Sequence, residues 1–70
     1  MNPSITVNGK PRALPPGLRV ADLVQEITGE DDPQGVAIAI NGAVIRRGLW
    51  TQTLVQARDE VEILHAVSGG

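Results

Sequence analysis

The sequence contains no cysteine, phenylalanine or tyrosine, and it has one histidine and one tryptophan. Without cysteine it forms neither disulfides nor thiolate metal sites, which agrees with a reducing cytoplasm. The six basic residues are scattered and few rings are available to stack on bases, so we expect no nucleic-acid partner. No apolar run is long enough to cross a membrane, and residues 1–4 do not resemble a signal peptide. We therefore expect a cytoplasmic protein without a membrane partner.

Side chains suited to catalysis are equally scarce. His65 lies in a strand-like stretch, where a lone histidine is usually a packed or half-exposed strand residue. The acidic run over residues 30–32 stands between Gly29 and Pro33 without converging partners, which is typical of a solvated loop. We predict no metal site, no bound cofactor and no enzymatic activity.

The first half of the chain contains a predicted hairpin followed by a helix. Asn8-Gly9 follows a short β-like run, and this dipeptide is the strongest short hairpin signal. Pro11 in the return strand favours a place at the edge of the sheet. Apolar residues at helical spacing then predict a helix that ends at Gly29. Its apolar stripe consists of Val20, Leu23, Val24 and Ile27.

The second half contains three further strand patterns. Residues 36–40 are apolar on both faces, which indicates a central strand, and Asn41-Gly42 turns the chain into residues 43–45. Trp50 is predicted to fill the core, because a large aromatic side chain buries more surface than its neighbours. Residues 51–58 are expected to be irregular with Leu54 tucked inward, and a last strand follows over residues 60–67.

This order of elements predicts an α+β fold of the β-grasp, or ubiquitin-like, type. A mixed sheet of four to five strands would carry one main helix on one face, with the first and last strands parallel and adjacent at its centre. We assign residues 1–67 to this domain and residues 68–70 to a C-terminal tail.

The tail reads Ser68-Gly69-Gly70. Glycine has no Cβ, so such an arm enters channels that would exclude any side chain. Fully extended, Val67 to Gly70 would span about 13 Å. On a chain with so few other reactive groups, the terminal carboxylate of Gly70 is the predicted reactive group.

Several ordered segments resemble the sulfur carrier proteins of thiamine biosynthesis, and the resemblance covers essentially the whole chain. The segments are V-N-G at 7–9, V-A-D-L at 20–23, G-V-A-I-A-I-N-G at 35–42, V-I-R-R-G-L-W at 44–50, D-E-V-E-I-L at 59–64 and the final Gly69-Gly70. One departure is Arg58, which stands where family members commonly have glycine before aspartate.

The resemblance implies a carrier whose partner enzymes perform the chemistry. An E1-like adenylyltransferase would use ATP to adenylate the carboxylate of Gly70. A persulfide donor, such as a cysteine desulfurase, would then convert it to a thiocarboxylate, and thiazole synthase would receive the sulfur. Ser68 and Gly69 would form the approach to the reacting residue.

The resemblance also implies that partners dock on the apolar sheet face near the tail. The candidate residues are Ala37, Ala39, Arg46, Leu64 and Ala66. Ordinary strand packing and a solvated basic turn at 46–47 are alternative interpretations of these residues. Three other functions stay open: the small subunit of molybdopterin synthase, a ubiquitin-like modifier that forms isopeptide bonds, and an interaction domain with an incidental tail.

Overall fold

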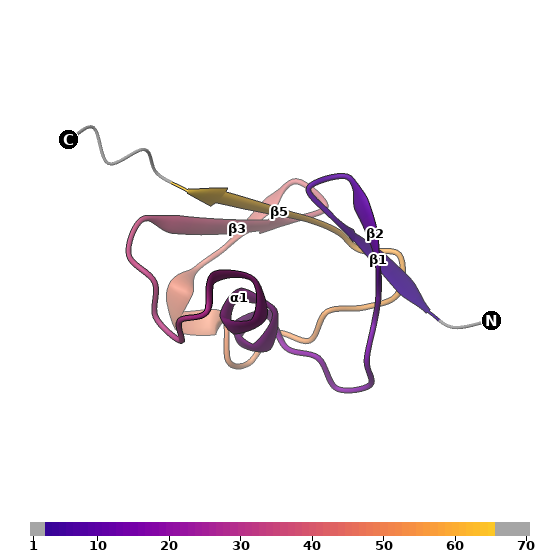
Figure 1. Cartoon of the computed structure of the whole chain (residues 1–70), viewed down its shortest axis with the longest axis horizontal. Coiled ribbons are helices and arrows are strands. Elements are labelled where there is room, and N and C mark those ends of the chain that lie inside the picture. Colours follow the sequence, from indigo (N-terminus) through magenta and orange to yellow (C-terminus); the bar gives the residue numbers. More distant parts are fainter. Residues whose placement is uncertain (1–2, 66–70) are drawn as a thin grey trace.

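The computed structural model describes residues 3–65 as a five-stranded mixed sheet with one α-helix across one face (Figure 1). The sheet order is β2-β1-β5-β3-β4. The elements are β1 (Ser4–Val7), β2 (Lys10–Ala13), α1 (Val20–Thr28), β3 (Val36–Ile40), β4 (Ala43–Ile45), the 3-10 helix η1 (Arg47–Leu49) and β5 (Glu60–His65). β1 and β5 are parallel neighbours, and the other paired strands are antiparallel. The predicted β-grasp arrangement is therefore confirmed.

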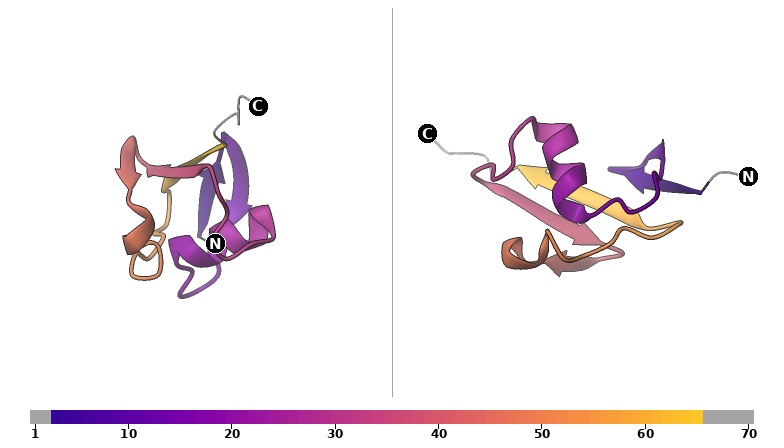
Figure 2. Two further views of the ribbon diagram at one scale, coloured as in Figure 1. Left: turned by 90° about the vertical axis from the view of Figure 1, so that its left-hand side faces the viewer. Right: turned by 90° about the horizontal axis from the view of Figure 1, so that it is seen from below.

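The core lies between α1 and the inner face of the sheet, and Figure 2 shows the helix crossing beneath the strands. Leu23 and Val24 are almost fully buried, as the helical spacing predicts. Trp50 is 3% exposed, and its indole N–H donates to the carbonyl of Ile45 over 3.0 Å, which confirms its predicted place in the core. The buried apolar cluster consists of Ile5, Leu18, Val20, Leu23, Val24, Val36, Ile38, Trp50, Val55, Val61 and Ile63.

Both ends of α1 have local physical causes. The backbone N–H of Arg19 donates to the Asp22 carboxylate over 2.9 Å, so the helix start is supported although Arg19 is a poor capping residue. At the other end Gly29 adopts a left-handed conformation, with φ of 80°, and donates to the carbonyl of Gln25 over 2.8 Å. The predicted stop at Gly29 is confirmed.

The central strand β5 is also held by the side chains of the two Asn-Gly turns. The Asn8 amide accepts from the Ile63 N–H over 2.9 Å and donates to the Ile63 carbonyl over 3.3 Å. It therefore extends the parallel β1–β5 pairing by one step beyond the end of β1. On the other side, the Asn41 side-chain oxygen accepts from the Glu60 N–H over 2.9 Å. Both asparagines have a φ of 51°, which the turns require.

The two edges of the sheet are short or interrupted. The backbone N–H of Leu14 donates to the carbonyl of Pro3, so the two residues form a hydrogen-bonded pair of the β1–β2 ladder. Hydrogen-bonded and non-hydrogen-bonded pairs alternate along antiparallel strands, so the Thr6–Pro11 pair is a non-hydrogen-bonded one. The backbone nitrogen of Pro11 therefore points away from β1, toward the free edge of the sheet. β2 is an edge strand, as its proline predicted. The opposite edge strand, β4, has only three residues.

The irregular segment over residues 51–58 differs from its prediction in one residue. Leu54 is 48% exposed, whereas Val55 is 6% exposed. The Val55 N–H donates to the carbonyl of Leu18 over 2.9 Å, and neighbouring residues of extended backbone point in opposite directions. Burial of Val55 therefore places Leu54 outside, and the prediction that Leu54 is tucked inward was wrong.

The contacts of Asn8 predict a stability difference between two variants. We expect Asn8→Ala to lower the free energy of unfolding by about 2 kcal/mol, because it removes two part-buried hydrogen bonds. Alanine would also have to adopt a positive φ, which it tolerates less well than asparagine. Asn8→Gly should cost less, since glycine accepts this φ. Urea unfolding followed by circular dichroism measures both, and equal losses would contradict the role of the backbone conformation.

Candidate functional site

The last strand that the structure describes, β5, ends at His65. His65 pairs with Val36 at the start of β3. The end of β5 lies at the side of the molecule opposite the start of β1 (Figure 1). The predicted tail residues Ser68, Gly69 and Gly70 lie outside the described residues, as does Ala66. The structure therefore describes the surface around the end of β5, and we call this end of the strand the root of the tail.

The sheet face opposite α1 presents an exposed apolar surface beside this root, which we call the outer patch. Ala37 and Leu64 are direct cross-strand partners, and Leu64 is 58% exposed. Ala39 pairs with Val44, which is 73% exposed. Ala37, Ala39, Val44 and Leu64 make up the outer patch.

The outer patch differs from the predicted set of residues in two ways. Ala39 is only 9% exposed, because it lies between its strand partners Val44 and Glu62. Among the large apolar side chains of residues 3–65, Val44 is the most exposed, yet it was not among the predicted residues. The alternation of β4 places it on the outer face with Ala39, and this signal becomes readable only once the register is known.

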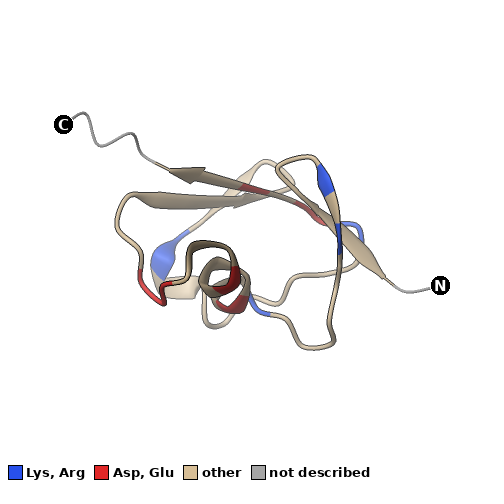
Figure 3. Cartoon of the chain, in the orientation of Figure 1, with Lys and Arg blue, Asp and Glu red and all other residues tan. Residues whose placement is uncertain are grey.

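Carboxylates border the outer patch, and Arg46 directly follows β4. Glu62 lies opposite Ala39 on the same face, and Glu60 precedes it by two residues in β5. Arg46 is exposed and forms no ion pair with any described side chain. Figure 3 shows acidic residues along β5, on α1 and in the loop after the helix.

Arg47, in contrast, is engaged within the protein. Its guanidinium forms an ion pair with Asp32 and donates to the carbonyl of Pro33 over 2.8 Å. The same group lies 4.7 Å from the centroid of the Trp50 ring. The loop over residues 30–32 is solvent-exposed as predicted, and Arg47 fixes its end against the core.

The described residues offer no alternative chemical centre. Within residues 3–65, no three histidine, cysteine, aspartate or glutamate side chains gather into a metal-binding group. His65 is exposed at the end of its strand, in agreement with the predicted strand role. No helix in the described part of the chain has the length and apolar character that a membrane crossing needs.

The order of the strands and the helix across one face of the sheet define a protein of the β-grasp class. Comparison with known proteins narrows this class. The chain belongs to the ThiS family, whose model matches residues 5–70. It is therefore a sulfur carrier of the thiamine pathway, a class of small proteins that interact with partner enzymes and are not themselves catalysts.

A solved structure supports the same assignment. The chain is similar to the crystal structure of a thiamine biosynthesis protein (ThiS) from Geobacter metallireducens, with 32% sequence identity and a TM-score of 0.76. The alignment covers 96% of this chain and 99% of that one. A comparison with curated protein sequences gave no significant match.

The neighbouring arginines predict a contrast in stability. Arg47→Ala should lower the free energy of unfolding by about 1–2 kcal/mol, because it removes the hydrogen bond to Pro33 and the stacking on Trp50. Arg46→Ala is the matched control and should change stability by less than about 0.5 kcal/mol. Thermal unfolding followed by the fluorescence of Trp50 compares the two, and equal effects would contradict the assigned role of Arg47.

Proposed function

We propose that Gly70 carries sulfur as a C-terminal thiocarboxylate. The observation that carries the proposal is the family match, which extends to Gly70 on a chain that ends in Gly69-Gly70. The direction of β5 and the exposed patch beside its end support it, because a carrier needs both a reactive end and a surface on which partners dock.

The chemistry requires activation by a partner. A carboxylate oxygen of Gly70 attacks the α-phosphorus of ATP in an adenylating enzyme, and pyrophosphate leaves. The sulfur of a persulfide donor, such as that of a cysteine desulfurase, then attacks the acyl carbon, and AMP leaves. A thiol then attacks the donor's sulfur in the resulting acyl disulfide and forms a disulfide with the donor, and the thiocarboxylate of Gly70 is the leaving group. Thiazole synthase would accept this sulfur, and the need for ATP and thiols makes the cytoplasm the expected location.

The carrier itself would contribute a narrow C-terminal segment and a surface on which the partner enzymes dock. Glycine at positions 69 and 70 keeps the approach to both partner active sites free of side chains. The outer patch would dock the partners near the root of the tail, since exposed Leu64 and Val44 lose water contact only in a complex. No cofactor is required on the carrier in this scheme, because ATP is bound by the adenylating enzyme.

The modification is testable by intact-protein mass spectrometry. After incubation with ATP, a competent adenylating enzyme, a persulfide donor and a thiol, we expect the mass increase of one sulfur-for-oxygen exchange. Removal of Gly70 should abolish the change without affecting folding. An unchanged mass of the full chain would contradict the proposal.

The pathway is tested separately by gene deletion. A strain that lacks the carrier should require thiamine for growth, and the full chain should restore growth, whereas the chain without Gly70 should not. A requirement for molybdenum cofactor instead would assign the sulfur to molybdopterin synthase. Slowly migrating conjugates in cell extracts would indicate a protein modifier.

The outer patch predicts a second, kinetic effect. Leu64→Ser should slow thiocarboxylate formation at limiting carrier concentration by about tenfold, because it removes apolar surface that the complex would bury. Leu49→Ser is the matched control, since Leu49 is 46% exposed but lies in η1 rather than on the outer sheet face. Equal rates for the two variants would contradict docking on the outer patch.

A further inference from the structure

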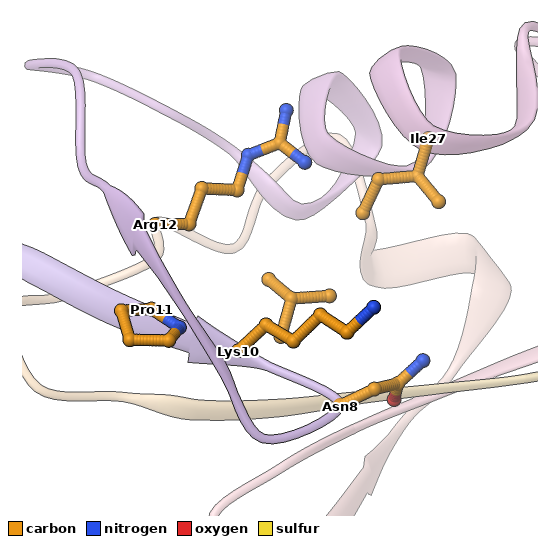
Figure 4. Close-up of a pocket in the computed structure, with 6 residues that line it drawn as sticks. Asn8, Lys10, Pro11, Arg12 and Ile27 are labelled. Atoms are coloured by element: carbon orange, nitrogen blue, oxygen red, sulfur yellow. The ribbon is translucent and has the colours of Figure 1, made fainter.

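An open groove lies on the opposite side of the sheet from the outer patch, between the β1–β2 hairpin and α1 (Figure 4). Its volume is about 410 Å³. The lining residues are Val7, Asn8, Lys10, Pro11, Arg12 and Ile27. None of them belongs to the outer patch or to the tail.

The groove exists because β2 directs charged side chains toward the helix. Lys10 pairs with Val7 and Arg12 pairs with Ile5, and directly opposed residues of paired strands share a face. At these two positions the side of β2 that faces α1 therefore carries cations in place of apolar side chains. As a result Val7 and Ile27 pack against the core but stay partly exposed at the floor of the groove.

The two cations differ in their internal partners. The Arg12 guanidinium lies 2.7 Å from the Glu26 carboxylate of α1, with both side chains substantially exposed. Lys10, the only lysine of the sequence, forms no ion pair within residues 3–65. The groove thus combines an apolar floor with one uncompensated positive charge at its rim.

We propose that this groove is a second docking surface, which binds an acidic segment with an apolar side chain from a partner protein. The proposal rests on the proposed function, in which the carrier meets more than one enzyme. An apolar side chain of the segment would cover Val7 and Ile27, while a neighbouring carboxylate would reach the ammonium group of Lys10. The carboxylates at 60 and 62 beside the outer patch favour a basic partner surface there, so the two faces of the sheet select opposite charges.

One feature of the groove favours a polypeptide over a small anion, and a second restricts how the polypeptide would bind. The Glu26 carboxylate beside Arg12 repels a compact anion, whereas an extended segment can place its carboxylate at Lys10 and its apolar side chain on the floor. Pro11 offers no outward N–H, so the segment would bind through its side chains rather than as an added strand.

The probe is a blocked hexapeptide in which leucine alternates with glutamate, titrated into the full carrier and followed by ¹H–¹⁵N NMR. We expect chemical-shift changes at the amides of Val7, Lys10 and Ile27. Lys10→Glu should weaken the peptide affinity by about fivefold. Arg58→Glu is the control with the same charge change, because Arg58 contacts Ser4 at the other end of β1, and it should leave the affinity unchanged.

Three results would overturn the proposal. The first is that the peptide causes no chemical-shift changes at the groove, and the second is that Lys10→Glu binds the peptide as tightly as the unchanged carrier. The third is that a peptide with glutamine in place of glutamate, or inorganic phosphate alone, causes the same shift changes as the acidic peptide. Lys10→Gln repeats the test without charge reversal if Lys10→Glu disturbs the spectrum. Because the peptide assay uses no enzyme, normal thiocarboxylate formation without peptide binding refutes only the groove. Peptide binding without thiocarboxylate formation refutes only the proposed sulfur chemistry.

Discussion

The rest of the structure depends on the pairing of β5 with strands on both sides. This last strand joins the hairpin formed by β1 and β2 to the hairpin formed by β3 and β4, so the sheet is continuous only through it. The side chains of Asn8 and Asn41 reinforce it where the backbone of the neighbouring strands turns away. One strand therefore closes the fold and also directs the chain toward its C-terminus.

The local patterns of the sequence predicted most of the fold. The helix with its stop at Gly29, both Asn-Gly turns, the edge position of Pro11 and the burial of Trp50 all depend on short-range rules of spacing and backbone conformation. The order of elements then restricted the topology to the β-grasp arrangement. These features were readable because each signal lies within a few residues.

The remaining features depend on contacts between distant segments. Asn8 and Ile63 are 55 residues apart, and no local sequence pattern at either position predicts the hydrogen bonds between them. Arg46 and Arg47 look equivalent in the sequence, although only Arg47 reaches Asp32, Pro33 and Trp50. Leu54 and Val55 lie in a segment without periodicity, so the sequence offered no basis for choosing between them, and the inward position was assigned to the wrong one. Val44 joined the candidate site only when the register of β4 became known.

The edges of the sheet have a consequence for the behaviour of the protein at high concentration. Exposed edge strands act as templates on which further copies can add in the manner of amyloid growth. Here Pro11 removes an outward donor from one edge, and the other edge offers only three residues. Fibril extension from the folded state is thereby disfavoured at both sides of the sheet. Both sides of this carrier's sheet are therefore protected against the addition of further copies of the chain.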